Sequence, residues 1–351
     1  MWPYIVVYIF FALKAISVRD RVSDEDRVQN ILLLGLFLIL FIGLRHHVGG
    51  DWNNYTRYFL TDIPYMDFKD AVTHEDPAFW VLSYIMYQWG FDLYGVNFII
   101  AISFVYGLFK FLNKQPNFWL GLTIAFPYLI IVVILGYIRQ GAAIGFILLA
   151  LVYLEEESFF KFLFSVIVAV MFHKTAMIII GIGLFLKGKY KLLKIVAVIL
   201  MGAGLWSSFL APKQEFLMQN YVYSNEYNSG GVWIRVIMNL IPSIILIIYR
   251  REWKRMFNDY GLSFILSISA VSAIFLVNVS STAADRMSLY FIPIQIIVFS
   301  RLHILLKGKV NPDSTKMIIV TYYFIIMFVW LNFGAYSKWW LPYENIMFFN
   351  F

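Results

Sequence analysis

Five short polar breaks interrupt an otherwise apolar sequence, and they hold the residues whose types and spacing could do chemistry. The breaks are Gly43–Tyr55, His74–Pro77, Gly136–Ala143, Phe172–Ala176 and Ala284–Met287. Each places charged or titratable side chains beside long apolar runs, where an unpaired charge is costly. Such charges are expected to meet an anion, a carboxylate or the edge of a membrane.

Three of the breaks carry an arginine, namely Arg45, Arg139 and Arg286. A guanidinium matches phosphate oxygens as a two-pronged donor, which predicts a phosphate-bearing ligand. For Arg45 the alternative is a side chain that reaches lipid headgroups. For Arg139 we favour a functional role, because a two-residue polar turn needs no arginine. Arg235 lies just inside a later apolar run and is expected to join these arginines.

Candidate proton acceptors lie in the same breaks. Asp51 is the first candidate for a general base, His173 the second, and Glu75 a further one. Capping of a neighbouring helix is the alternative role for Asp51 and for His173. Asp76, which precedes Pro77, is interpreted as a helix-capping residue.

The composition predicts a membrane protein. Of the 351 residues 61% are hydrophobic and 14% charged, whereas roughly a quarter of a soluble domain is charged. The basic residues flank apolar runs instead of forming one patch, which excludes nucleic acid as a partner. The chain has no cysteine, and the adjacent His46 and His47 do not share a helix face, so no metal site is predicted.

The apolar runs predict an all-α, polytopic transmembrane bundle that forms a single integral membrane domain over residues 1–351. About 12 crossing helices are expected. Their predicted ranges are 2–16, 30–44, 95–112, 118–136, 138–154, 159–172, 174–187, 191–210, 232–249, 261–279, 286–304 and 316–334. Most of the 28 lysines and arginines fall in alternate connections, which places those connections in the cytoplasm. The five polar breaks then form an active site on the extracytoplasmic face.

One apolar segment, Pro77–Phe91, does not fit this alternation. If it crossed the membrane, Lys110 and Lys114 would lie outside. We expect instead a re-entrant or an interfacial helix, and a re-entrant piece would imply a cavity. The longest outer segments are then Arg45–Asp76 and Ala211–Val232.

Aromatic residues accompany the polar breaks. Trp52 and Tyr55 are candidates for stacking on sugar rings. Trp339 and Trp340 could do the same, but anchoring at the membrane interface is the favoured role for this pair.

Taken in order, the breaks resemble the EpsG branch of the Wzy-type polysaccharide polymerases. The similarity rests on Arg45, Gly49, Asp51 and Tyr55, then Glu75, then Ile138, Arg139, Gln140 and Ala142, then Phe172, His173 and Ala176, and finally Arg286 and Tyr290. It covers residues 1–305, and Lys174 departs from it by standing where a small polar residue is expected.

The resemblance implies a membrane glycosyltransferase of the bacterial inner membrane that works on its periplasmic side. It would polymerise undecaprenyl-diphosphate-linked oligosaccharide repeat units into O antigen, capsule or exopolysaccharide. A chain-length regulator protein is a further implied partner, and no cofactor is expected. The diphosphate is assigned to Arg45, Arg139 and Arg286, the proton transfer to Asp51, His173 and Glu75, and other substrate contacts to Tyr55, Gln140, Lys174 and Arg235.

Three alternatives remain open at the level of sequence. A flippase or transporter predicts charges near the bilayer midplane and an inverted repeat. A lipid-linked oligosaccharide ligase would use the same arginines but usually carries one large outer loop. Another membrane transferase, such as an acyltransferase, is the third.

Overall fold

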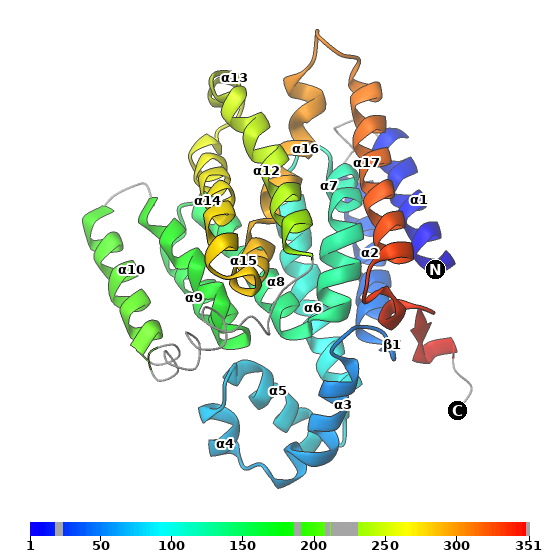
Figure 1. The fold of residues 1–351 in the computed structure, drawn as a ribbon, viewed down its shortest axis with the longest axis vertical. Helices are drawn as coiled ribbons and strands as arrows, with labels where there is room; N and C mark the ends of the chain where they lie inside the picture. The colour runs from blue at the N-terminus through cyan, green and yellow to red at the C-terminus, as the bar shows by residue number, and fades with distance from the viewer. Residues whose placement is uncertain (18–23, 186–190, 208–210, 212–230, 349–351) are drawn as a thin grey trace.

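Long apolar runs become helices that lie side by side in a bundle, with a small helical lobe at one end (Figure 1). The computed structural model describes residues 1–17, 24–185, 191–207, 211 and 231–348. The bundle elements are α1 (Trp2–Ser17), α2 (Asp24–Gly43), α6 (Leu93–Leu112), α7 (Phe118–Ala125) with the π-helix η2 (Phe126–Ile134), α8 (Ile138–Glu155), α9 (Phe159–Phe172), the 3-10 helix η3 (Lys174–Phe185), α10 (Lys191–Leu205), α12 (Val232–Ile248), α13 (Arg250–Met256), α14 (Tyr260–Val279), α15 (Ser281–Ser288), η7 (Leu289–Phe291), α16 (Pro293–Leu305) and α17 (Pro312–Phe333).

The helices fit a polytopic membrane protein, but the predicted count of crossings is not confirmed. Within the described residues, four helices are long and apolar enough to cross a membrane alone: α6, α8, α14 and α17. Two bent pairs raise this number to six, namely α12 with α13 (79°) and α15–η7 with α16 (45°). The other ranges predicted as spans lie on helices too, but these are shorter or less apolar.

The helices α6 and α8 pack closely at the centre of the bundle because glycines face each other there. A Cβ atom added to Gly107 would lie 2.1 Å from the carbonyl oxygen of Gly145. Small residues at a crossing allow main chains to approach and gain van der Waals contact. This close contact fixes α8, whose first turn carries Arg139.

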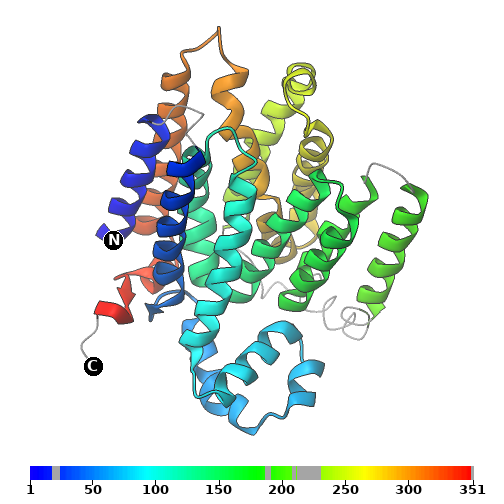
Figure 2. The same ribbon diagram turned by 180° about the vertical axis from the view of Figure 1, so that it is seen from behind.

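The two ends of the bundle differ in the chemistry of their connections. The basic helix α13 and the connection between α16 and α17 lie at one end, and the lobe lies at the other (Figures 1 and 2). The lobe end also carries the junction of α9 with η3 and helix α15, which hold two of the polar breaks. The basic helix α13 and these polar breaks therefore lie at opposite ends of the bundle.

The lobe consists of α3 (Trp52–Thr61), η1 (Ile63–Tyr65), α4 (Phe68–Thr73) and α5 (Pro77–Gln88). Helix α5 has 12 residues, far fewer than the roughly 20 that a crossing needs. It lies with α3 and α4 beyond the ends of the bundle helices, as an interfacial helix would (Figures 1 and 2). The segment Pro77–Phe91 therefore does not cross the bundle.

The C-terminal segment returns to the first polar break. Strand β1 (Arg45–His46) pairs antiparallel with β2 (Glu344–Asn345), with Arg45 opposite Asn345. Two short 3-10 helices flank β2, η8 (Ser337–Trp340) and η9 (Ile346–Phe348). The predicted outer segment Ala211–Val232 lies largely outside the described residues.

Candidate functional site

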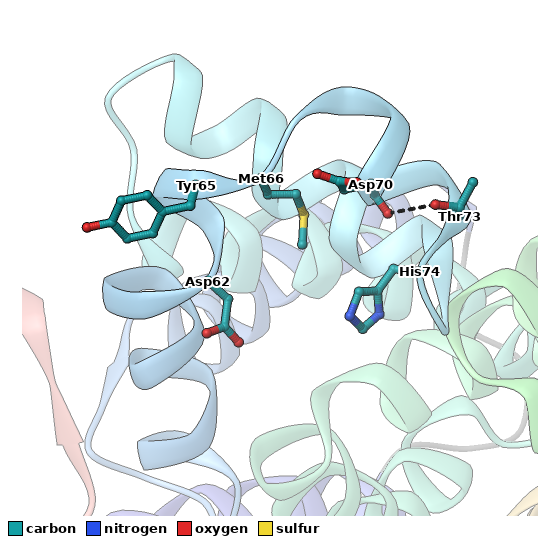
Figure 3. Close-up of a pocket in the computed structure, with 6 residues that line it drawn as sticks. All are labelled: Asp62, Tyr65, Met66, Asp70, Thr73 and His74. Carbon is teal, nitrogen blue, oxygen red and sulfur yellow. Dashed lines mark hydrogen bonds between the residues drawn. The ribbon is translucent and has the colours of Figure 1, made fainter.

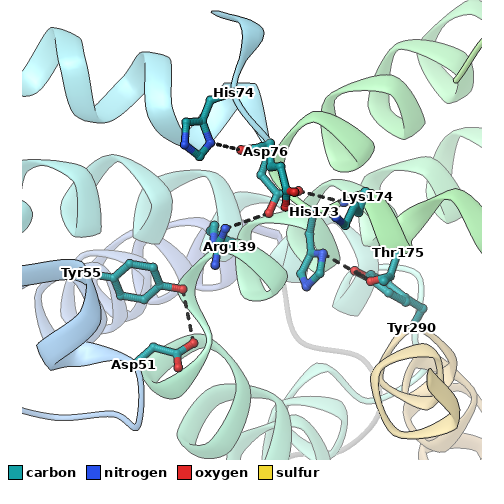
Figure 4. A network of polar contacts seen from close by, with 10 residues as sticks. Asp51, Tyr55, His74, Asp76, Arg139, His173, Lys174, Thr175 and Tyr290 are labelled. Atoms are coloured by element: carbon teal, nitrogen blue, oxygen red, sulfur yellow. Dashed lines mark hydrogen bonds and ion pairs between the residues drawn. The ribbon is translucent and has the colours of Figure 1, made fainter. Parts of the chain in front are cut away.

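Polar side chains from four breaks converge where the lobe meets the bundle (Figure 4). Asp51 and Tyr55 come from the start of α3, and Asp76 precedes α5. Arg139 lies in the first turn of α8, and Tyr290 lies in η7. The junction of α9 with η3 supplies His173, Lys174 and Thr175. The sequence places these residues up to 239 positions apart, so the fold alone brings them together.

Asp76 is the centre of the cluster, and although it occupies the predicted N-cap position of α5, its carboxylate does not cap the helix. Its side chain makes no capping hydrogen bond, and its backbone adopts a left-handed conformation with φ of 55°. The carboxylate instead pairs with Nη1 of Arg139 at 3.0 Å and accepts the main-chain N–H of Lys174 at 3.1 Å. Burial raises the pKa of Asp76, and the nearby charge of Arg139 opposes this rise. The left-handed turn thus aims the acid at two other breaks.

Asp51 lies beside this pair. It precedes α3 but makes no side-chain cap; Oδ2 accepts the hydroxyl of Tyr55 at 3.4 Å. The Tyr55 ring is buried, with its centroid 5.9 Å from the guanidinium carbon of Arg139. Burial raises the pKa of Asp51, while Arg139 and, less strongly, Arg286 oppose the rise. Asp51 is therefore a partly buried carboxylate facing two cations.

His173 ends α9 and lies deep in the cluster. Its Nδ1 is 3.4 Å from the hydroxyl of Thr175, which in turn lies 3.0 Å from the hydroxyl of Tyr290. Burial lowers the pKa of His173 well below its ordinary value, and the charges of Arg286 and Arg139 add to this effect. The imidazole is therefore neutral near pH 7 and can accept a proton.

Two further predicted residues, Glu75 and Lys174, pair with each other at the rim. Nζ of Lys174 lies 3.1 Å from Oε2 of Glu75, and 39% of the Glu75 side chain is exposed. The amide of Gln140 donates to the carbonyl of Arg286 at 2.8 Å. Gln140 therefore holds the main chain of α15.

Arg235 and Arg286 have different surroundings. Arg235 forms an ion pair with Asp285 and contacts the hydroxyl of Tyr128, so it joins α12 to α15 and to η2. Arg286 is the next residue after Asp285, and its charge acts on Asp51 and on Asp76. Of the two arginines, Arg286 is the one whose charge bears on the acids of the cluster.

Arg45 does not fit its predicted role in binding diphosphate. Its side chain is buried, and its guanidinium donates to the carbonyls of Ile42, Val48 and Leu135 at 2.8–3.2 Å. A fourth contact at 3.4 Å reaches Oδ1 of Asn97. Main-chain carbonyls in or next to two breaks thus engage Nε and Nη1 of Arg45, which joins the first break to the residue before the third.

Trp340 is a residue of the site region that the sequence interpretation missed, because it was expected at the membrane interface. It is fully buried, and Nε1 donates to the carbonyl of Ile131 at 2.7 Å. A Cβ atom on Gly136 would lie 2.1 Å from its ring, and one on Gly49 would lie 2.1 Å from the carbonyl of Leu135. Trp340 therefore packs against the third break, and the two glycines let the breaks carrying Asp51 and Arg139 touch. The glycine at position 136 is the sequence signal for this contact.

A pocket of about 410 Å³ opens on the lobe (Figure 3). Its lining is acidic and partly apolar and comes from η1, α4 and their flanks: Asp62, Tyr65, Met66, Asp70, Thr73 and His74. His74 stacks on Trp80 and immediately precedes Glu75 and Asp76. The pocket and the cluster around Asp76 are therefore joined by one short segment of chain, but the pocket lining holds carboxylates and no lysine or arginine, whereas the cluster pairs carboxylates with cations.

Comparison with known proteins gives one match. A model described as the EpsG family matches residues 30–345, which is nearly the whole chain. No curated protein and no solved structure matches.

Proposed function

The chain belongs to the EpsG family, whose members are Wzy-type polymerases, and we propose that it joins oligosaccharide repeat units carried on undecaprenyl diphosphate. The reaction takes place on the periplasmic side of the bacterial inner membrane and builds O antigen, capsule or exopolysaccharide. A chain-length regulator protein is the partner proposed for it. At the coarser level, the chain is a multi-pass membrane protein for polysaccharide polymerisation.

One observation supports this function most directly, namely the cluster of cations and carboxylates at one end of the bundle. Arg139, Lys174 and Arg286 come from three separate breaks, and Arg139 and Lys174 each contact Asp76. A lipid-linked diphosphate lies at the level of the headgroups, which is the depth that we propose for these helix ends. Cations at that depth suit its phosphates, while its lipid tail stays in the bilayer.

The proposed step transfers the growing chain from its diphosphate lipid to a new repeat unit. An acceptor hydroxyl attacks the anomeric carbon, the bond from that carbon to the diphosphate oxygen breaks, and the hydroxyl proton passes to a base. The leaving diphosphate gains negative charge, and cations aimed at it lower the barrier. Arg139 and Arg286 take this role, with Lys174 at the rim.

Asp51 is our proposed general base. It is partly buried and faces two arginines, and its pKa is raised by burial, so it is a stronger base than an exposed carboxylate. His173 is the second candidate, because it is half-buried in the same cluster and its lowered pKa favours the neutral imidazole. Glu75 is paired with Lys174 at the rim, which suits contact with substrate better than proton abstraction.

The glycan is proposed to lie along the lobe. The pocket there is lined by Asp62 and Asp70, whose carboxylates accept hydrogen bonds from sugar hydroxyls and repel phosphate. Tyr65 at this pocket is 88% exposed and offers an aromatic face to a sugar ring. The carboxylates of the pocket and the cations of the cluster would hold the glycan and the diphosphate on different sides of Asp51.

A test is complementation of a strain of the native host that lacks this chain. Wild-type protein should restore a ladder of surface polysaccharide, whereas Arg139→Gln should leave single repeat units on the lipid carrier. Arg57→Gln on the exposed side of α3 is the matched control and should give a full ladder. Full ladders from both Arg139→Gln and Asp51→Asn would reject the proposed site. A ligase would instead leave the polymer intact on its carrier lipid and block its transfer to the final acceptor.

A further inference from the structure

The helix that carries Arg286 is broken, and the break leaves one carbonyl without its usual helical donor. Helix α15 ends at Ser288, η7 follows, and α16 begins at Pro293 after a bend of 45°. The N–H of Ile292 would bond to Ser288 in a continuous α-helix, but it bonds to Leu289 instead. The carbonyl of Ser288, at the start of η7, therefore loses its α-helical partner and accepts a side-chain donor as well.

Three buried side chains supply that donor through a chain of hydrogen bonds. The hydroxyl of Tyr323 donates to Oε1 of Gln295 at 2.8 Å, and Nε2 of Gln295 donates to Oδ1 of Asn239 at 2.7 Å. Nδ2 of Asn239 then donates to the carbonyl of Ser288 at 2.7 Å. All three side chains are at most 2% exposed, so water does not compete with these bonds.

The direction of this chain is set by the carbonyl at its end. A carbonyl only accepts, so Asn239 must turn its amide nitrogen towards Ser288 and its oxygen towards Gln295. Gln295 must then donate to Asn239, which leaves its oxygen for the hydroxyl of Tyr323. Four elements, α17, α16, α12 and α15, are thereby joined in one defined arrangement.

The last turn of α15 is held from a second side as well. The carbonyl of Arg286 accepts the amide of Gln140, which follows Arg139 in α8. One anchored carbonyl thus belongs to Arg286 itself, and the other lies two residues later, at Ser288. Together the anchors set where this arginine sits relative to Asp51 and Asp76.

We propose that Tyr323, Gln295 and Asn239 are positioning residues that set Arg286 in place for the lipid diphosphate. This inference rests on the proposed polymerase function. The three residues act through the main chain of α15 and do not touch the substrate. Their loss should weaken the handling of the diphosphate and leave the recognition of the glycan unchanged.

The experiment uses purified full-length protein and lipid-linked repeat units. Tyr323→Phe removes only the first donor of the chain, and Asn239→Asp replaces the donor to Ser288 with an acceptor. Loss of one buried hydrogen bond predicts a fall in turnover of about fivefold for Tyr323→Phe, and more than tenfold is expected for Asn239→Asp. Tyr322→Phe is the matched control, because it removes a neighbouring hydroxyl that lies outside this chain, and it should keep wild-type turnover.

Two readouts separate positioning from a general loss of stability. Undecaprenyl diphosphate, the leaving product, should inhibit Tyr323→Phe and Asn239→Asp at several-fold higher concentration, while the KM for the acceptor repeat unit stays constant. In an Arg286→Lys background, which keeps the charge but not the two-pronged geometry, Tyr323→Phe should add little further loss. Multiplicative losses in that background would overturn the inference.

Failure of the inference is distinguishable from failure of the proposed function. Arg139→Gln could stop polymerisation while Tyr323→Phe and Asn239→Asp both turn over like wild type. That result would reject the positioning role and leave the proposed polymerase function in place. If Arg139→Gln and Asp51→Asn both polymerise normally, the proposed site itself is wrong, and the positioning role falls with it.

Discussion

Two arginine–aspartate pairs lie at opposite ends of the bundle, and their surroundings indicate different roles. At the lobe, Arg139 pairs with Asp76 at 3.0 Å, and 29% of the arginine side chain is exposed. At the opposite end, Arg301 pairs with Asp259 at 3.1 Å, and both side chains are only 6% exposed. The distances are nearly equal, so the ion pairs alone do not separate the two regions.

The surroundings of the two guanidinium groups make the difference. Arg301 also donates to Gln115 at 2.6 Å, and its guanidinium lies within 6 Å of the rings of Trp253 and Phe257. A charge enclosed in this way joins α16 to α13 and to the connection after α6, and it has no room for a ligand. Arg139 keeps an exposed side, so its charge can reach a substrate. Exposure, more than pairing, distinguishes the arginine that we propose to contact the substrate.

The largest expected effect is on stability, at the enclosed pair. Arg301→Gln leaves Asp259 buried without its partner, which should reduce the free energy of unfolding by about 3–5 kcal/mol. Thermal unfolding of the purified protein would measure the loss, and turnover per folded molecule should stay near wild type. A stable but inactive Arg301→Gln variant would contradict the structural role of Arg301, because it would show that Arg301 takes part in the reaction.

Next in size is the loss of the proposed base. Asp51→Asn should lower turnover by about 10²–10⁴-fold. Asp51 works as a carboxylate, and its pKa is raised by burial. Wild-type turnover should therefore fall, on acidification, at a pH above the ordinary carboxyl value of about 4, and the Asp51→Asn variant should lack this limb. The same limb in the variant would transfer the role to another group, with His173 next.

A smaller effect is expected when Arg139 keeps its charge but changes shape. Arg139→Lys retains the attraction to Asp76 and loses the two-pronged donor, so turnover should fall by at least about tenfold. The unfolding midpoint should change little, because the buried carboxylate keeps a cation. A large drop in stability without a drop in turnover would make this pair structural, like Arg301 and Asp259.

The smallest expected effect on turnover and stability is at the rim of the cluster, where Glu75 pairs with Lys174. Glu75→Gln breaks a partly exposed ion pair with Lys174, and such pairs contribute about 0–1 kcal/mol to stability. Turnover should change by no more than a few-fold, as measured with the same lipid-linked substrate. Complete loss of activity in Glu75→Gln would show that Glu75 is a catalytic group and not only a contact at the rim.

The sequence predicted most of the helical ranges well, because helix formation depends on local properties. The assignment of one end of the bundle to the cytoplasm stays a prediction. Apolar runs form helices that satisfy their own backbone, and flanking lysines and arginines report orientation. The crossing count was not confirmed, since several helices are shorter than a bilayer requires and pack instead against other helices. Pro77–Phe91 was expected not to cross the membrane, and its helix of 12 residues lies in the lobe, outside the bundle.

The site residues were predicted less evenly. Asp51, Arg139, His173 and Lys174 do gather in one place, whereas Asp76 was assigned to capping. A Pro after an acid is typical of a cap, and the left-handed backbone at Asp76 that turns the carboxylate away is not visible in the sequence. The role of Trp340 was missed because its partner, Gly136, lies 204 positions earlier.

By itself, the sequence determined that this is a helical membrane protein with arginines and acids at helix ends, because composition and periodicity are local. Only the tertiary structure decided which arginine is available. Arg45 and Arg139 both follow apolar runs near glycines, yet Arg45 meets the carbonyl of Leu135, and Arg139 meets Asp76 with one side exposed. The reason is physical: a guanidinium takes the nearest buried acceptors, and these are supplied by segments far away in the chain.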